Sequence, residues 1–312
     1  MSEKPVLPRH PVWPTMLFMT FLALVGAIIW WAATLGVNAG IVISSGPFAW
    51  VTGGPALIAA YTMVGLVGAV AVPVWSLGAG LICADHACGA HGSTASTMNI
   101  TFFSDTHPIN KVTQALAERM GLPKVPHVGW YPAEEINAFA MGTSPNNALV
   151  ALSKGAIERL TKQELIAIIG HELGHVVSGD MARMTLARNV QEGLSFFLLL
   201  RGLKTFVRWV FTPLSELELL RMSRAREYVA DEISAIMLGS HHMIAALERL
   251  RDETLKPEPG RLANVMMWTG FVGPELLSTH PPLERRIERL RGYQLKQQIK
   301  DAPRTPVFEP AQ

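Results

Sequence analysis

The strongest constraint on this chain is a long stretch that carries no charged side chain. Of its 27 Lys and Arg and 25 Asp and Glu residues, none lies between Arg9 and Asp85. Only 17% of the 312 residues are charged and 49% are hydrophobic, whereas roughly 25% charged residues is typical of a soluble domain. This charge-free stretch, residues 10–84, is long enough for two membrane spans of about 20 residues each. The layout predicts a membrane anchor at residues 1–92 and argues against a disordered or fully soluble chain.

Two transmembrane helices are predicted within this anchor, at about residues 17–35 and 55–82. The segment 36–54 is rich in Gly, Ser and Pro and is expected to form the loop between them. Removal of the first helix as a signal peptide is disfavoured, because its apolar run is long and a second run follows. Lys4 and Arg9 precede the first helix and the loop is uncharged, which places the large C-terminal part in the cytoplasm.

Overall charge and cysteine content narrow the function classes further. A net charge of +2 gives no reason to expect nucleic acid as a partner, and two cysteines exclude a disulfide-stapled scaffold. Cys83, His86, Cys88 and His91 lie close together after the second apolar run. They have the elements of a metal site, but two reduced thiols and two histidines at a helix exit are the favoured interpretation.

The region from residue 93 to 300 predicts a mainly helical α+β domain with a small sheet. A helix is expected at 104–121, capped by Ser104 or Asp105, and short apolar segments at 127–131, 136–141 and 149–152 are typical of strands. A capping box, Thr161-x-x-Glu164, predicts a helix that runs to about Ser178. The last residues, 301–312, contain three prolines and are expected to be a flexible tail.

The motif His171-Glu172-x-x-His175 within this helix carries the chemistry. Residues four apart lie on one face of a helix, so that both imidazoles can bind one metal ion. Glu172 lies beside them, where it can take a proton from an activated water and pass it to a leaving amine. Gly174 is expected to leave room near the metal. The alternative, a pair of helix histidines without a metal, is disfavoured because burying these groups unpaired is costly.

A zinc site also needs a third protein ligand from another element. Asp180 is expected to be too close in sequence to fold back. Glu227 and Asp231 are again four residues apart, so one of them can bind the metal while the other accepts a hydrogen bond from a ligand imidazole. The residues alone leave other downstream candidates open, namely Glu192, Glu216, Glu218, Glu232, His241, His242 and His280.

These motifs resemble the M48 family of membrane zinc metallopeptidases, and within it the HtpX-type heat-shock proteases. The matching pieces are the HExxH motif of residues 171–175, Arg226-Glu227-Tyr228-x-Ala230-Asp231, Asn137-Ala138-Phe139-Ala140-x-Gly142, and Thr279-His280-Pro281-Pro282 followed by Glu284-Arg285-Arg286-Ile287. With the apolar N-terminal part, they cover most of the chain.

The resemblance implies a gluzincin (HExxH) fold with one Zn²⁺ per chain. It implies His171, His175 and Glu227 as ligands, Glu172 as the catalytic acid and base, and Asp231 as the hydrogen-bond partner of a ligand histidine. It implies an edge strand at Asn137, Ala138, Phe139 and Ala140 that binds the backbone of polypeptide substrates. It also implies His280 as a catalytic histidine, for which capping of the following helix is the alternative. A bacterial inner-membrane protease that clears damaged membrane proteins fits this pattern.

The chain departs from the family pattern at residues 194–214. The apolar run expected there is interrupted by Arg201, Lys204 and Arg208. This composition predicts an amphipathic helix that lies on the membrane surface or inserts only partly. Two other functions stay open at this point: a prenyl-protein peptidase of the same superfamily, and a zinc-dependent membrane regulator that binds clients without cutting them. The sequence gives no oligomeric state.

Overall fold

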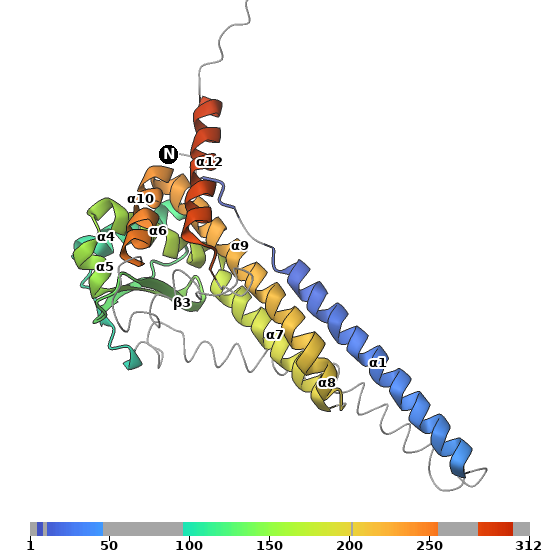
Figure 1. Cartoon of the computed structure of the whole chain (residues 1–312). Helices are drawn as coiled ribbons and strands as arrows, with labels where there is room; N and C mark the ends of the chain where they lie inside the picture. Colours follow the sequence, from blue (N-terminus) through green and yellow to red (C-terminus); the bar gives the residue numbers. More distant parts are fainter. Residues whose placement is uncertain (1–4, 9–10, 46–95, 201, 255–279, 302–312) are drawn as a thin grey trace, which may run out of the picture.

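The computed structural model of the chain describes residues 5–8, 11–45, 96–200, 202–254 and 280–301. Within these residues a mainly helical fold surrounds one small mixed sheet, as the sequence predicts. The described residues form two parts (Figure 1). The head contains residues 96–178, 239–254 and 280–301, and a long arm that extends from it contains the helices at residues 13–45, 180–200 and 212–238. The second predicted transmembrane helix, the cluster from Cys83 to His91 and the tail beyond Asp301 lie outside the described residues.

The sheet holds four strands in the order β1-β2-β4-β3. β2 (His127–Tyr131) has the predicted bounds and runs parallel to β4 (Asn147–Ser153). β3 (Ala138–Ser144) pairs with β4 in an antiparallel hairpin, and β1 (Thr101–Phe102), which the sequence did not predict, pairs with β2. Among the described strands, β3 is therefore an edge strand.

The helix before β2 is shorter than predicted. It is α4 (Pro108–Met120), and its N-cap is His107, whose Nδ1 accepts a hydrogen bond from the Ile109 N–H at 3.3 Å. The prediction of a cap at Ser104 or Asp105 was wrong, because proline is favoured at the first helical position and fixes the start at Pro108. Gly121 ends the helix in the left-handed conformation, as expected.

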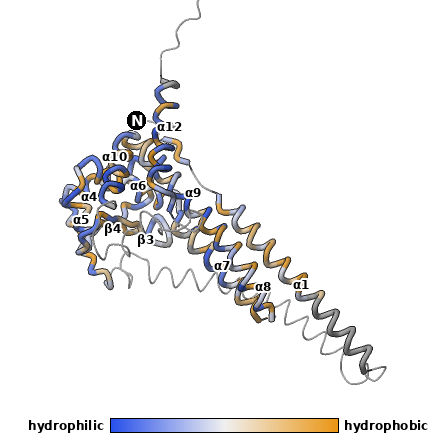
Figure 2. The backbone as a smooth tube through the Cα atoms, viewed as in Figure 1, coloured by the Kyte–Doolittle hydropathy of each residue, from blue (hydrophilic) through white to orange (hydrophobic). Residues whose placement is uncertain are grey.

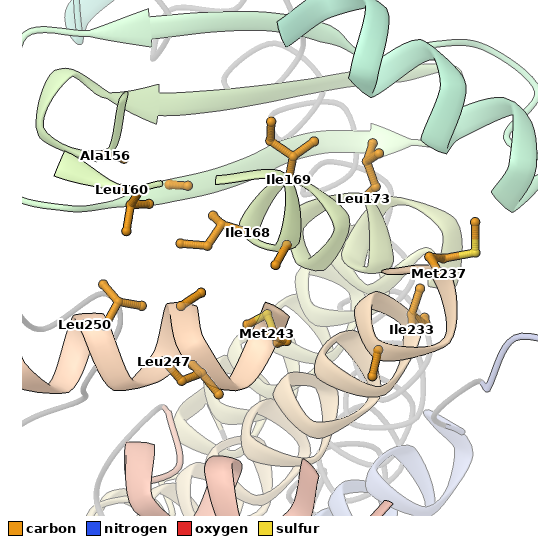
Figure 3. Packing of buried hydrophobic residues seen from close by; sticks show 14 of the residues in the cluster. Ala156, Leu160, Ile168, Ile169, Leu173, Ile233, Met237, Met243, Leu247 and Leu250 are labelled. Atoms are coloured by element: carbon orange, nitrogen blue, oxygen red, sulfur yellow. The ribbon is translucent and has the colours of Figure 1, made fainter. Parts of the chain in front are cut away.

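The core of the head forms around α6 (Lys162–Ser178). Ile168, Ile169 and Leu173 of this helix lie between the sheet on one side and helices α9 (Thr212–Leu238) and α10 (Ser240–Thr254) on the other (Figure 3). Burying each of these side chains stabilises the fold by about 1.5–3 kcal/mol relative to exposure. The short helix α5 (Lys154–Arg159) follows β4, and α12 (Leu283–Asp301) packs against α9 and α10. This packing fixes α6 at the centre of the head.

The arm contains three long helices, and two of them form a hairpin. α7 (Asp180–Leu200) runs outward from the head, and α9 (Thr212–Leu238) returns to it (Figure 1). The turn between them includes Gly202, with φ +76°, followed by the short helix α8 (Lys204–Phe206) and a π-helix, η2 (Val207–Phe211). The prediction of one amphipathic helix at 194–214 was wrong. Gly202 adopts the left-handed backbone conformation and reverses the chain between the two apolar halves of this segment.

α1 (Trp13–Ser45) is the third helix of the arm and lies against α7 and α9. It is longer than the predicted span of 17–35, and residues 36–45, predicted as loop, are helical. Isolated glycines such as Gly36 and Gly40 cost only about 1 kcal/mol each in a helix and do not end an apolar one. Among the described helices, α1 alone is long and apolar enough to cross a membrane, by length and composition. In Figure 2 the coloured part of α1 is mainly hydrophobic, whereas α7 and α9 carry both hydrophobic and hydrophilic residues.

Candidate metal centre

α6 brings the two histidines of the HExxH motif onto one buried face. The helix starts with the predicted capping box: Thr161 Oγ1 accepts a hydrogen bond from the Glu164 N–H, and Glu164 Oε2 accepts one from the Thr161 N–H at 2.8 Å. This start sets the register of the helix, and the ring centroids of His171 and His175 lie 4.8 Å apart, one turn from each other. Both imidazoles are buried, as is Glu172 beside them.

Glu227 of α9 lies opposite the two imidazoles. Its Oε1 is 3.3 Å from His175 Nε2, and its Oε2 is 3.5 Å from His171 Nε2. Ligand atoms bound to one tetrahedral zinc at about 2.0–2.1 Å lie about 3.3 Å from one another. The chain therefore presents two imidazoles and one carboxylate whose ligand atoms all lie within 4.8 Å of one another, a group that could hold a metal ion such as zinc.

The charges of the buried groups also fit a cation. Four carboxylates are buried here, those of Glu172, Asp180, Glu227 and Asp231. Three guanidiniums lie against them: Arg286 is fully buried, and the side chains of Arg226 and Arg183 are 14% and 30% exposed. With neutral histidines, this set carries a net charge of −1. Because buried charge is costly unless it is compensated, a bound cation would offset this excess of negative charge.

Asp231 contacts the side of His171 that faces away from Glu227. Its Oδ1 is 2.9 Å from His171 Nδ1, and both of its oxygens accept hydrogen bonds from Arg286, at 2.8 Å and 2.6 Å. Burial alone would raise the pKa of Asp231, but the charge and hydrogen bonds of Arg286, with the bond to His171, outweigh it and lower the pKa. Asp231 is therefore an ionised acceptor for the Nδ1–H of His171.

Asp180 contacts the other imidazole, a role that the sequence analysis missed. Its Oδ2 is 3.4 Å from His175 Nδ1 and 3.6 Å from Arg226 Nε. The exclusion of Asp180 as a third ligand holds, but the reason given for it does not: Gly179 ends α6 in the left-handed conformation and turns the chain, so that Asp180 reaches His175. Asp180 does not join the group of possible metal ligands, which is His171, His175 and Glu227.

Two arginines at the site also went unrecognised in the sequence, although both stood within the family-like motifs. Arg286 lies on the same face of α12 as the buried Leu283, Ile287 and Leu290. A charged residue on an apolar helical face is costly to bury unless it is paired, so its position was a readable signal. Arg226 gives no such signal, because it lies among other charged residues of α9.

The remaining predicted site residues lie around this centre. His280 lies just before α12, and its Nδ1 is 3.2 Å from Glu227 Oε2. β3, with Ala138, Phe139 and Ala140, packs against α6. Asn137 precedes β3, and its backbone already bonds Ser153: the Asn137 N–H donates to Ser153 Oγ, and Asn137 O accepts from the Ser153 N–H, both at 2.9 Å. Asn137 therefore anchors the strand.

Comparison with known proteins gives one family. Residues 103–294 match Peptidase family M48. Protease HtpX of Haemophilus ducreyi is 36% identical over 202 residues, which cover 57% of this chain and 70% of that protein. Protease HtpX of Ectopseudomonas mendocina is 37% identical over 208 residues, which cover 58% and 71%. Among solved structures, Ste24p of S. mikatae aligns with this chain over 89% of this chain and 66% of Ste24p, just under two thirds of the Ste24p length. The TM-score is 0.48 and the sequence identity is 18%, and we infer no function from this likeness.

Proposed function

This chain belongs to peptidase family M48 and is a metalloprotease that hydrolyses peptide bonds, and from this premise we propose that it is a zinc endopeptidase of the bacterial inner membrane that removes damaged or misfolded membrane proteins. The observation that carries the proposal is the convergence of His171, His175 and Glu227 beside the buried Glu172. One zinc ion per chain is the proposed cofactor, and polypeptides and the lipid bilayer are the proposed partners.

His171, His175 and Glu227 would hold the metal, and bound zinc would supply Lewis acidity that polarises a peptide carbonyl and acidifies a water. Glu172 follows His171 on α6, so its carboxylate is carried by the helix that carries both imidazoles. In the proposed reaction it accepts the proton of the attacking water and then donates it to the leaving amine. His280, held against Glu227, would stabilise the negative charge that develops on the carbonyl oxygen.

β3 is the proposed binding edge for an extended substrate. The side of this strand that faces away from β4 has no partner among the described strands, and the strand packs against the helix of the HExxH motif. A peptide that pairs with this edge would gain backbone hydrogen bonds that do not depend on its side chains. Such binding suits a protease that acts on many different damaged proteins.

The arm is the proposed membrane anchor. Large apolar side chains of α1 point outward, among them Trp13, Leu17 and Phe21, which are 73%, 70% and 59% exposed. The hairpin tip exposes Leu200 and Trp209, at 64% and 69%. Exposed apolar surface of this kind is costly in water and favourable in lipid. We place the arm partly in the bilayer, with Lys204 and Arg208 of the tip near lipid headgroups and the head in the cytoplasm.

Zinc content and casein cleavage in detergent test the enzymatic proposal. Wild type and Glu172→Gln are both expected to bind about one zinc, and Glu172→Gln is expected to lower kcat by at least about hundredfold, because the proton-transfer group is lost. Glu158→Gln, at an exposed helix position, is the control and should match wild type. Zinc binding without cleavage in the wild type would favour the non-proteolytic regulator, and absence of zinc would refute the metal site.

A further inference from the structure

Both proposed metal-binding imidazoles are held by the same kind of chain of contacts. From His171 the contacts lead to Asp231 and then to Arg286, and from His175 they lead to Asp180 and then to Arg226. We propose that Arg226 and Arg286 are positioning residues, each of which holds the carboxylate that orients one imidazole. The proposal rests on the proposed zinc site, so its test separates failure of the site from failure of the positioning role.

The carboxylates act on the side of each ring opposite to the metal position. A hydrogen bond from Nδ1–H to a carboxylate fixes the tautomer and leaves the lone pair on Nε2, the atom that faces Glu227 in both histidines. A ring held in this way cannot rotate away from the metal. The carboxylate can do this only if it is itself held in place, and in this chain an arginine lies against each of the two carboxylates.

Arg286 makes the tighter of the two arrangements. Its Nε and Nη2 donate to different oxygens of Asp231, and its Nη1 lies 3.4 Å from Glu227 Oε2. One rigid guanidinium thus contacts the partner of His171 and the third proposed ligand at the same time. Lysine has a single donor group and cannot reproduce this planar geometry.

Arg226 makes the looser arrangement. Its Nε is 3.6 Å from Asp180, whose distance to His175 Nδ1 is 3.4 Å, and Arg183 also approaches Asp180 at 3.9 Å. Arg226 precedes Glu227 on α9, so the helix that supplies the third ligand also holds the partner of His175. Because these contacts are longer and partly open to solvent, we expect a smaller effect on the metal than at Arg286.

Metal affinity measured on the full chain in detergent tests the proposal. Zinc dissociation constants from chelator competition would be compared for wild type, Arg286→Gln, Arg286→Lys, Arg226→Gln and Asp180→Asn. The visible absorption of the Co²⁺-loaded proteins would report ligand geometry independently of activity. Arg291→Gln on α12 and Arg221→Gln on α9 are matched controls, because these side chains are 59% and 55% exposed and pair with Glu248 and Glu218. Circular dichroism would verify that each variant is folded.

Arg286→Gln is expected to weaken zinc binding by about 10–100-fold, and Arg226→Gln and Asp180→Asn by a smaller but measurable factor of up to about tenfold, each with an altered Co²⁺ spectrum. Arg286→Lys should recover only part of the loss, and the kcat of every site variant should fall more than its KM changes. Folded Arg226→Gln and Asp180→Asn proteins with wild-type affinity and spectrum would overturn the role of Arg226. The same result for Arg286→Gln, or for Arg286→Lys if the Gln variant does not fold, would overturn the role of Arg286. A wild-type protein that does not bind zinc would instead refute the zinc site.

Discussion

At the scale of single residues, Gly174 determines how closely α6 and α9, the helices that carry the proposed metal ligands, approach each other. It lies inside the HExxH motif, between Glu172 and His175. A Cβ atom at this position would meet Ala230 of α9, with Cα at 3.1 Å and the carbonyl oxygen at 3.3 Å. The expectation that Gly174 leaves room near the metal needs correction: the space is occupied by the backbone of α9. Because Glu227 lies one turn before Ala230, this close approach brings the third proposed ligand to the histidines.

Gly174→Ala should therefore destabilise the fold and weaken metal binding together. An added methyl group in a closely packed contact costs about 1–3 kcal/mol, because α9 must shift. Gly292→Ala on α12 is the control: nothing lies within 4 Å of its added Cβ, and it should be neutral or stabilising by up to about 1 kcal/mol. Chemical unfolding and chelator competition measure both effects. A Gly174→Ala protein with wild-type stability and zinc affinity would contradict this role.

Local spacing predicted part of the candidate site, and contacts between distant segments account for the rest. His171, Glu172 and His175 follow from helical periodicity within five residues. Glu227 and Asp231 could be named but not ranked from the residues alone, because their orientation depends on how α9 packs against α6. Arg286 lies 55 residues beyond Asp231 in sequence, a pairing that no local pattern gives.

At the scale of secondary-structure elements, β3 presents two residues to its open edge. The Ser153 N–H donates to Asn137 O, which makes this residue pair a hydrogen-bonded one. Backbone groups in an antiparallel strand point alternately toward and away from the partner strand. Asn137, Phe139 and Met141 therefore face β4, and the N–H and C=O groups of Ala138 and Ala140 face outward.

Ala140→Pro should impair substrate binding without disrupting the sheet. Proline removes an outward N–H and is tolerated at an edge. We expect a severalfold higher KM for an extended peptide with unchanged zinc content, because a substrate that pairs with this edge loses a donor. Ala140→Ser keeps the N–H at similar size and is the control. An unchanged KM in a folded Ala140→Pro protein would show that substrates do not pair with this edge.

Elements with strong local signals were predicted well. The bounds of β2 and the capping box of α6 came directly from the sequence, since strand-forming residues and a cap need no distant partner. The hairpin of α7 and α9 was missed, because the turn at Gly202 interrupts what is otherwise a helical pattern of apolar and basic residues. β1 has two residues and forms only by pairing with β2.

At the scale of the whole molecule, the arm has a packed inner side and an apolar outer side. Met19 and Leu22 of α1 are buried against the hairpin, and Thr15 donates a hydrogen bond of 2.7 Å to Glu218 of α9. The outer side keeps the exposed apolar side chains described above. The charge-free stretch correctly predicted an apolar helix near the N-terminus. That the hairpin of α7 and α9 packs against this helix is seen only in the structure.

A labelling experiment in liposomes tests the membrane placement. In a chain with Cys83→Ser and Cys88→Ser, a Leu200→Cys variant should react severalfold more slowly with a membrane-impermeant maleimide than a Glu158→Cys variant, because lipid would cover the hairpin tip and not the head. Both should react fully after unfolding in detergent. Equal rates in liposomes would place the tip in water and leave the arm anchored by α1 alone.

Because α9 is one continuous helix, a movement of the hairpin would also move Glu227 in the proposed metal site. Glu227 lies 15 residues after Thr212 without a break in the helix, a distance of about 22 Å. A change of about 5° in the tilt of this helix would displace one end relative to the other by about 2 Å. Misplacement of a reacting group by about 1 Å can cost about hundredfold in rate. Bilayer thickness, by setting the tilt of the hairpin, would then adjust the rate of proteolysis to the state of the membrane.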